Sequence, residues 1–451
     1  MTKKASRSLS VFWVIVTILV AISAGLAGAN WMYQYSQRSA SRTTVVWISV
    51  DGLRGDYVTR GAFPFFARLG REGATTSQLQ PVFPSITFPS HVSEATGVTV
   101  EKHGITANAF YDTATKVQSS YPSDSALLQA EPIWITAQRQ GVRTAVLDWP
   151  LSFAQKGPVR TEIFGQTYDG NQTDEQRLNR LLEVWSASLA KADPVPLQLL
   201  MGYVVSTDKP GHNKGPDSPE IAQEMVAIDA LLSKFSARAV ELWKRQSRTS
   251  KDRLFIVIST DHGMSPVKFI VSLDRVLGVA RRDPEIRLST TGNIGHVFLD
   301  PVKYPPQSPA RDAKLVELRD RLTAAGPDFR AFRREDMPAE WGYAHPTRSG
   351  DLVIVLPKGY TFGWAENIAA AIAEVGTNPA DVRGMHGYDV ATNPEMLGFL
   401  AIWEPGKVRP LALGPVKWDQ LHPTVAMLLG IAPAAGAKGA PLNFGTASLT
   451  P

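Results

Sequence analysis

Cysteine is absent from the 451 residues of this sequence. The absence excludes a fold held together by disulfide bonds, and it excludes metal sites with thiolate ligands. Any metal ion that the protein binds must therefore be held by aspartate, glutamate and histidine side chains. With 44% hydrophobic and 20% charged residues, the composition is that of a globular protein.

Acidic residues are absent from residues 1–42, where the basic residues are Lys3, Lys4, Arg7, Arg38 and Arg42. These five account for the net charge of +5, because the rest of the chain has 42 basic and 42 acidic residues. A neutral body lacks the basic surface that nucleic-acid binding requires, so no nucleic-acid partner is predicted.

Charge is also absent from residues 11–29, which follow the basic start. At about 1.5 Å per residue, a helix of this length crosses the hydrocarbon core of a bilayer. The stretch Ala27-Gly28-Ala29 fits a signal-peptidase cleavage site. Residues 1–42 are therefore predicted to be either a cleaved signal peptide or an uncleaved membrane anchor with its linker. In both cases residues 43–445 are expected outside the cytoplasm.

Nearly continuous apolar runs predict strands that are buried on both faces. These runs lie at residues 44–52, 144–149, 197–208, 253–263, 296–300, 352–357 and 396–403. Helical spacing of apolar residues predicts helices at residues 65–73, 218–245 and 419–431. Strands that alternate with helices predict an α/β fold with a mostly parallel central sheet. Residues 301–350, rich in proline and charge, are predicted to form a peripheral excursion.

Three of the predicted strands end in residues of the types that bind metals in proteins. Asp51 ends the first run, Asp208 ends the third, and Asp261 with His262 ends the fourth. Ligands of open α/β sheets bind at the carboxyl ends of the strands, so one shared site is predicted there. Taken alone, Asp51 is better explained by an Asp-Gly turn than by metal binding.

Two further histidines are candidate ligands. His212 follows Asp208 by four residues, and the intervening Pro210 and Gly211 predict a loop rather than a helix. His386 lies between two glycines in GMHGYD, where a purely structural role is the alternative. Aspartate and histidine together suit zinc, manganese or another divalent ion. The set is too large for one tetrahedral zinc and suits two ions, the arrangement used for displacement at phosphorus.

The stretch PSITFPSH, residues 84–91, places Thr87 between Pro84 and Pro89. The prolines predict that no long regular element crosses this stretch. A threonine hydroxyl is a weak nucleophile that metal coordination can activate, which makes Thr87 a candidate nucleophile. The alternative is a proline-rich surface loop with an incidental threonine.

Six motifs together resemble the nucleotide pyrophosphatase/phosphodiesterase family of the alkaline phosphatase superfamily. They are VDGLRGDY, PSITFPSH, HGITANAFYD, STDKPGH, STDHGM and MHGYD, in the family's order, from about residue 45 to 390. The resemblance implies an alkaline-phosphatase-like three-layer α/β/α sandwich with a small inserted cap. It also implies a bacterial-type hydrolase of nucleotide phosphodiester or pyrophosphate bonds, in the periplasm or anchored in the inner membrane and facing it. Residues 43–445 would be the catalytic domain, and its substrate a small nucleotide or related phosphodiester.

The resemblance also implies roles for single residues. One zinc ion would be held by Asp51, Thr87, Asp261 and His262, and the other by Asp208, His212 and His386. Thr87 would be the nucleophile, and a phosphothreonine intermediate would be hydrolysed in a second step. Asn108 would donate to a phosphate oxygen beside the Thr87 N–H group. Phe88 and Tyr203 would flank the base of a nucleotide, with a plain core role as the alternative.

The sequence departs from the family pattern at two positions, and other activities are alternatives to the one implied. Ser90 stands where the family has asparagine, and Thr207 stands where it has proline. His91 and His103 are candidates for supporting the site from behind. Phosphomonoesterase, phosphonate hydrolase and phospholipid headgroup phosphodiesterase are alternatives, and so is a non-catalytic binding protein. Monoesters need extra positive charge, for which only Arg54 and Lys209 lie near the motifs.

Overall fold

The computed structural model describes residues 42–190, 195–247, 249–280, 282–363, 370–375 and 382–444. The predicted targeting segment, residues 1–42, lies outside these ranges except for its last residue. Within them, no helix combines the length and the apolar character needed to cross a membrane.

Nine strands form the central sheet, in the order β19-β2-β18-β8-β1-β7-β5-β6 with β20 beside β2. They are β1 (Thr43–Val50), β2 (Ala74–Gln80), β5 (Thr144–Val146), β6 (Ile163–Phe164), β7 (Leu199–Val204), β8 (Arg253–Ser259), β18 (Gly398–Trp403), β19 (Leu411–Ala412) and β20 (Val416–Lys417). Strand β1 lies parallel to both β7 and β8, whereas β18 is antiparallel to its neighbours β8 and β2. The predicted α/β fold with a mostly parallel sheet is confirmed.

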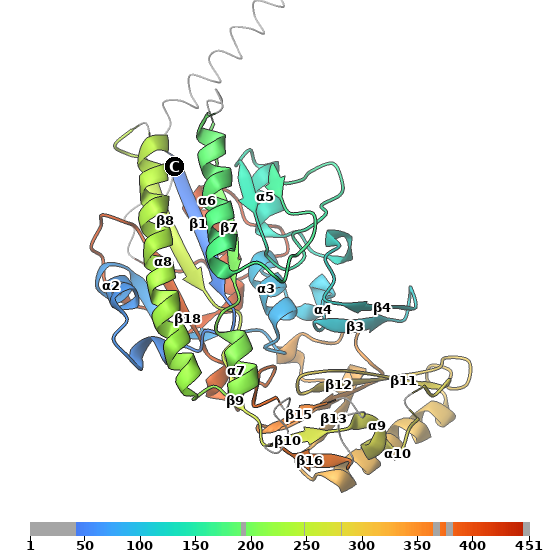
Figure 1. Cartoon of the computed structure of the whole chain (residues 1–451). Helices are drawn as coiled ribbons and strands as arrows, with labels where there is room; N and C mark the ends of the chain where they lie inside the picture. The colour runs from blue at the N-terminus through green and yellow to red at the C-terminus, as the bar shows by residue number, and fades with distance from the viewer. Residues whose placement is uncertain are drawn as a thin grey trace, which may run out of the picture.

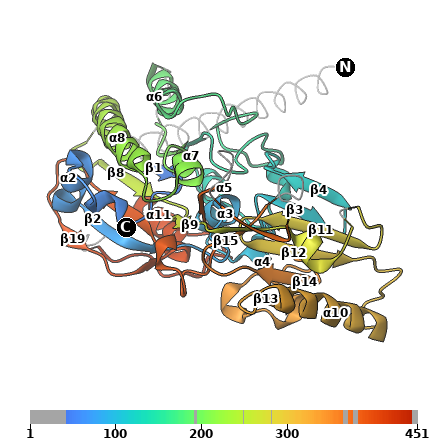
Figure 2. The ribbon, with the colours of Figure 1, turned by 60° about the horizontal axis from the view of Figure 1, so that its bottom comes forward.

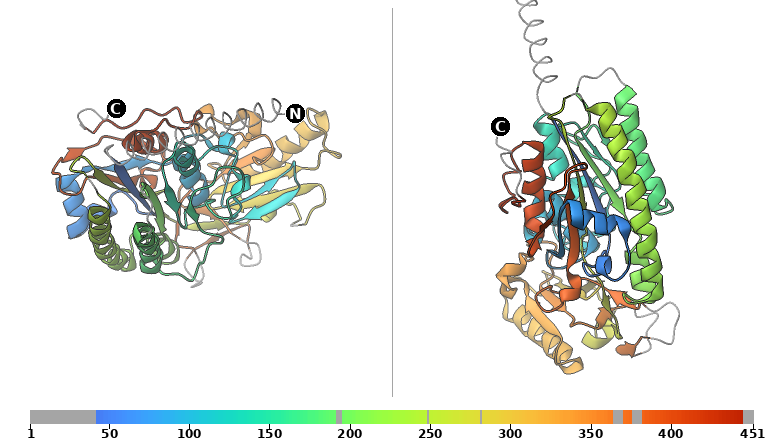
Figure 3. Two further views of the ribbon diagram at one scale, coloured as in Figure 1. Left: turned by 90° about the horizontal axis from the view of Figure 1, so that it is seen from above. Right: turned by 90° about the vertical axis from the view of Figure 1, so that its left-hand side faces the viewer.

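Helices cover both faces of this sheet and give three layers (Figure 1; Figure 3, right). One layer holds α2 (Pro64–Glu72), α6 (Asp174–Ala190) and α8 (Pro219–Gln246), and the other holds α3 (Thr87–Thr96), α5 (Ile133–Arg139) and α11 (Leu421–Leu429). Along β1, Val46, Ile48 and Val50 pack with α6 and α8, and Val45 and Trp47 pack with α5 and α11. Because both faces are buried, the strand reads as one unbroken apolar run.

A cap lies beside the carboxyl ends of the parallel strands (Figure 1, Figure 2). Its elements are β10 (Phe269–Val271), α9 (Leu273–Leu277), β11 (Ile286–Thr291), β12 (Ile294–Leu299), α10 (Pro309–Ala325), β13 (Arg330–Arg333), β14 (Leu352–Val355), β15 (Tyr360–Phe362) and β16 (Ile372–Glu374). Strands β12 and β14, predicted as members of the parallel sheet, instead pair antiparallel with each other here. The predicted excursion at residues 301–350 is thus only the middle of the cap.

Short elements carry the loops around the sheet edge. They are α4 (Val100–His103), β3 (Ala109–Asp112), β4 (Val117–Ser120), α7 (Asp208–Lys214), β9 (Ser265–Pro266) and β17 (Gly384–Met385), with 3-10 turns at Tyr57–Thr59, Ser125–Leu127, Arg334–Asp336, Ala339–Trp341, Pro394–Met396 and Trp418–Gln420. Helix α7 corrects the loop predicted between Asp208 and His212. Pro210 and Pro89 are each the third residue of a helix, α7 and α3. The first N–H groups of a helix have no partner inside it, so proline is tolerated there.

Candidate active site

The candidate ligands meet at one edge of the sheet because their strands are neighbours. Strand β1 lies between β7 and β8, with Val50 opposite Val204 and Ser49 opposite Ser259. Asp51 directly follows β1, and the ligands after β7 and β8 follow within a few residues. The structure therefore brings together the side chains that the sequence placed at three strand ends.

The turn after Asp51 lies very close to the segment that holds Asp208. Gly52 has a φ of +66°, and a Cβ atom on it would lie 3.1 Å from Cα of Asp208. Its N–H group donates to Oδ1 of Asp261 at 3.1 Å. A residue with a side chain would be strained in this conformation and would push the Asp208 segment away.

A first cluster of candidate ligand atoms surrounds Nε2 of His262. Oδ2 of Asp261 lies 3.1 Å away, Oδ1 of Asp51 lies 3.3 Å away, and Oγ1 of Thr87 lies 3.3 Å away. The two carboxylate oxygens are buried and have no hydrogen-bond partner among the described residues. In a tetrahedral zinc site with bonds near 2 Å, neighbouring ligand atoms lie about 3.3 Å apart. The spacing and the unpaired oxygens both fit a divalent ion at this position.

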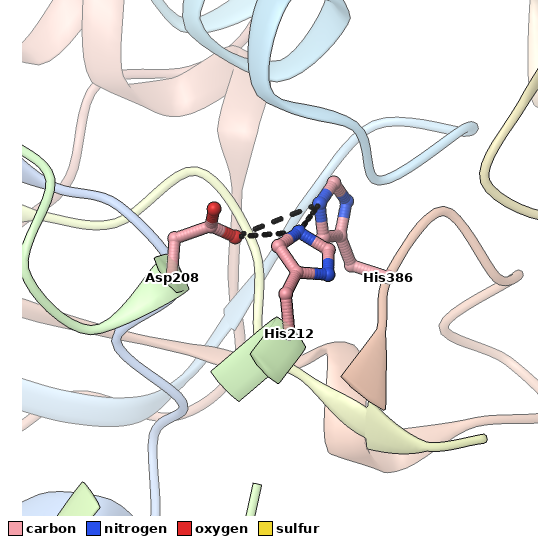
Figure 4. Close-up of side chains that lie close together, drawn as sticks. All are labelled: Asp208, His212 and His386. Atoms are coloured by element: carbon pink, nitrogen blue, oxygen red, sulfur yellow. Dashed lines mark hydrogen bonds and ion pairs between the residues drawn. The ribbon is translucent and has the colours of Figure 1, made fainter. Parts of the chain in front are cut away.

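A second cluster holds Asp208, His212 and His386 (Figure 4). Oδ1 of Asp208 lies 3.2 Å from Nε2 of His212 and 3.6 Å from Nε2 of His386, and the two Nε2 atoms are 3.2 Å apart. Helix α7 presents Asp208 and His212 on one face, since residues four apart are neighbours on a helix. Asp208 also groups with Asp51 and His262 within 4.8 Å, so the two clusters adjoin.

The backbone orients the three histidines for metal binding. Nδ1 of His212 pairs with the carbonyl of Gly384 at 2.7 Å, Nδ1 of His262 with that of Gly263 at 2.9 Å, and Nδ1 of His386 with that of Ser85 at 3.0 Å. A carbonyl only accepts, so each Nδ1 must carry the hydrogen. In its neutral form each ring would offer its Nε2 lone pair to the cluster, and this is the form that binds a metal.

Burial and neighbouring charges shift the pKa values of the residues in both clusters. Burial raises the pKa of Asp51 well above its usual value, and the nearby carboxylates of Asp261 and Asp208 raise it further. Although burial opposes ionisation, His212 holds the pKa of Asp208 at about 2. Burial lowers the pKa of His386, and the neighbouring His262 and His212 add to the effect. Three carboxylates in one buried space favour divalent cations, which would compensate their charge.

Thr87 is the first residue of α3, at the rim of the first cluster. His91, one turn along, pairs through Nδ1 with the Thr87 carbonyl at 2.8 Å and lies 3.4 Å from Oδ2 of Asp261. It therefore contacts both a candidate ligand and the segment that holds Thr87. His103 instead pairs with Ser93 at 2.9 Å, away from the clusters. The buried Ser90 hydroxyl has no hydrogen-bond partner among the described residues, and nothing in the structure explains its presence.

Asn108 lies against the start of α3. Its Oδ1 accepts a hydrogen bond from the Phe88 N–H group at 2.9 Å. Because that partner is a donor, the amide oxygen must face it, and the NH2 group points its hydrogens at acceptors, one of which is the Tyr121 hydroxyl. This orientation suits the predicted role of a donor to a phosphate oxygen.

The aromatic residues Tyr203 and Phe88 have different surroundings. Tyr203 is 6% exposed, its ring packs edge-on to His91, and its hydroxyl donates to Oδ2 of Asp51. The ring beside Phe88 is Tyr121, with centroids 5.8 Å apart. Tyr121 is 67% exposed and has a φ of +43°, unusual for a residue other than glycine. Sequence reasoning missed Tyr121, because only its distance from Phe88 in space marks it.

A family model for type I phosphodiesterase/nucleotide pyrophosphatase matches residues 45–389. The chain belongs to this family. The family resemblance predicted from the six motifs is therefore confirmed. As a member of the nucleotide pyrophosphatase/phosphodiesterase family, the protein is a hydrolase with candidate metal-binding groups in its active-site region.

Relatives in the family match most of the chain. An uncharacterised pyrophosphatase/phosphodiesterase of Schizosaccharomyces pombe is 30% identical over 359 residues, covering 77% of this chain and 68% of that protein. Human bis(5'-adenosyl)-triphosphatase ENPP4 is 27% identical over 396 residues, covering 86% and 78%. The structure of human ENPP5 superposes with a TM-score of 0.72 at 25% identity, covering 89% of this chain and 98% of that one.

Proposed function

We propose that this protein hydrolyses phosphodiester or pyrophosphate bonds of nucleotides, with Thr87 as the nucleophile and two zinc ions as cofactors. The arrangement around His262 carries the proposal. There the Thr87 hydroxyl stands at 3.3 Å from Nε2, at the same distance as a carboxylate oxygen of Asp51. A nucleophile that shares a ligand cluster with carboxylates is expected when a metal activates it.

The proposal assigns the ligands by cluster. The first ion would be held by Asp51, Thr87, Asp261 and His262, and the second by Asp208, His212 and His386. When bound, the pair of ions activates the attacking oxygen and neutralises charge that develops on the phosphoryl group. Zinc suits the mixed carboxylate and imidazole donors, and manganese or another divalent ion is the alternative.

The residues of the chain would carry out two displacements. In the first, Oγ1 of Thr87 forms a bond to phosphorus and an alcohol or a phosphate leaves. In the second, water cleaves the phosphothreonine, and Thr87 regains its hydroxyl hydrogen. The Asn108 NH2 group and the N–H of Thr87, the first residue of α3, would hold a phosphate oxygen in both steps.

A diester is favoured over a monoester by the surroundings of the nearby cations. The Arg54 guanidinium is bound to the carboxylates of Asp56 and Asp217, and Lys209 is exposed. Arg54 therefore does not offer the extra charge that a dianionic phosphoryl group requires. A nucleotide is favoured by the bis(5'-adenosyl)-triphosphatase named among the relatives. Phe88, half-buried at the nucleophile, is proposed to contact the base, and a base-binding role for Tyr203 stays a prediction.

The proposed place of action is outside the cytoplasm, in a bacterial periplasm or on the membrane that faces it. Support comes from the sequence of residues 1–42 alone. Fractionation of cells that express the full chain tests this part of the proposal. Activity in the cytoplasmic fraction would contradict it.

The deciding experiment compares a nitrophenyl ester of a nucleoside monophosphate with nitrophenyl phosphate, with and without a chelator. The proposal expects faster turnover of the diester and loss of activity on complete metal removal. Thr87→Ala should abolish turnover and keep about two metal ions per chain. Preference for the monoester, or activity that survives metal removal, would overturn the proposal.

A further inference from the structure

We propose that Arg54 is a positioning residue that holds three of the ligand-bearing segments, the loops after β1, β7 and β8, in a fixed relation. The inference rests on the proposed two-metal function. It assigns to Arg54 a role other than binding the substrate phosphate, since the guanidinium is bound within the protein.

One guanidinium reaches all three loops. Arg54 itself lies three residues after Asp51 on the β1 loop. Its Nη1 donates to the carbonyl of Met264 at 3.1 Å, two residues after His262. Its Nη2 donates to Oδ1 of Asp217 at 3.2 Å, in the turn that follows the helix bearing His212.

The guanidinium is itself held firmly. Nε and Nη2 donate to the two oxygens of Asp56 at 2.7 and 3.0 Å, a bidentate pairing that fixes its plane. The charge lies 5.0 Å from the centre of the Tyr57 ring, and the Tyr57 hydroxyl donates to the Pro216 carbonyl at 2.9 Å. The turn after α7 is thus tied twice to the β1 loop.

The loop after His262 is packed closely against Arg54, so a change in the position of Arg54 would move this loop. A Cβ on Gly263 would lie 1.9 Å from the carbonyl oxygen of Glu395 and 3.1 Å from Cγ of Arg54. Gly263 therefore lies between two fixed neighbours, one residue from the ligand His262. A shift of the Arg54 side chain would change the position of that ligand.

Arg60 provides a matched control within the same cluster. It donates to Asp56 at 2.7 Å and to Asp217 at 2.8 Å, and lies 5.1 Å from the Tyr57 ring. In the described part of the chain its side-chain hydrogen bonds reach these two carboxylates alone. Its side chain is 38% exposed, against 8% for Arg54. Arg60 thus shares the charge contacts of Arg54 without the contact to the loop after His262.

The test uses the full-length zinc-loaded protein and the variants Arg54→Met, Arg54→Lys and Arg60→Met. Zinc release to a chromogenic chelator and separate kcat and KM values are measured. Outer partners of metal ligands typically contribute 10- to 100-fold, so Arg54→Met should loosen at least one zinc and lower kcat by about tenfold or more, with KM nearly unchanged. Arg54→Lys should rescue little, because an ammonium cannot span three loops in a plane. Arg60→Met should stay within about threefold of wild type.

If the variants at the buried Arg54 fail to fold, Asp217→Ala replaces them in the test, because Asp217 is exposed. This variant removes the tie between Arg54 and the turn after α7, and is expected to loosen zinc in the same direction. The inference would be overturned if the Arg54 variants matched wild type and Arg60→Met in zinc release and kcat. If the Arg54 variants do not fold, the same result for Asp217→Ala would overturn it. Either result would leave the proposed function standing. A wild-type protein that binds no zinc would instead remove the proposed function on which the inference rests.

Discussion

The phenol of Tyr203 donates a hydrogen bond to Oδ2 of Asp51 and leaves Oδ1 of the same carboxylate facing His262 at 3.3 Å. The contact divides the two oxygens of one carboxylate between the protein and the proposed metal. It also places Tyr203 behind a candidate ligand, with its ring against His91. The bond therefore acts on the orientation of Asp51.

Tyr203→Phe removes this bond and keeps the ring. We expect zinc affinity to fall by roughly 10- to 100-fold, because Asp51 loses the group that fixes its plane. Competition with a chelator measures the change. Tyr343→Phe is the matched control, since it removes a buried hydroxyl that donates to the Thr106 carbonyl at 2.8 Å, outside the ligand clusters. Equal zinc affinity in both variants would contradict the assignment.

Asn108→Ala removes the proposed donor to the phosphate oxygen. Loss of one such donor typically lowers kcat about 100- to 1,000-fold, and we expect a loss of this size. Zinc content should stay at the wild-type value, because Asn108 is outside both clusters. Steady-state kinetics on a nucleotide diester with parallel metal analysis checks both points. A fall in zinc content along with kcat would indicate a structural role instead.

Glu94 is fully buried in α3, where burial raises its pKa well above the usual value and Asp261 raises it further. A folded-state pKa above the unfolded one means that this carboxyl stabilises the fold below about pH 4.5 and less as pH rises toward the folded value. Glu94→Gln cannot ionise and keeps an acceptor for Ser259. In metal-free protein we expect its Tm to exceed that of wild type by a margin that grows from pH 4.5 to 8. A margin independent of pH would contradict the ionisation.

Zinc should stabilise the fold through its ligands. A ligand at about 100 times its Kd adds about 2.7 kcal/mol to the free energy of unfolding, so zinc should raise the Tm of metal-free protein. His386→Ala should show a smaller rise, because one cluster loses a ligand, and His103→Ala is the control away from the clusters. Calorimetry of the three proteins with and without zinc measures this. An identical rise in all three would exclude His386 as a ligand.

The sequence predicted the central fold and the meeting of the ligands for one physical reason. Strands buried on both faces are unbroken apolar runs, and the neighbouring parallel strands β7, β1 and β8 all end at one edge. Side chains that follow them, such as Asp51 and Asp261, must therefore lie close together. No long-range information was needed for this step.

The features that the sequence could not supply depend on position within an element or on contacts far apart in the chain. Pro210 suggested a loop, yet as the third residue of α7 it loses no helical hydrogen bond. The runs that became β12 and β14 carry no sign of which sheet they join. Tyr203 was predicted either to flank the base of a nucleotide or to be a core residue. Its bond to Asp51, which spans 152 positions in the chain, carries no sign in the sequence. Tyr121 became visible only beside Phe88 in space.

His386 joins its cluster from β17, which pairs with β9 at the point where the chain leaves for the cap. The chain therefore enters the cap after β9 and leaves it at the neighbouring strand β17. The last candidate ligand, His386, is synthesised only after the whole cap. A nascent chain that stopped at β16 would hold every other candidate ligand and still lack this one.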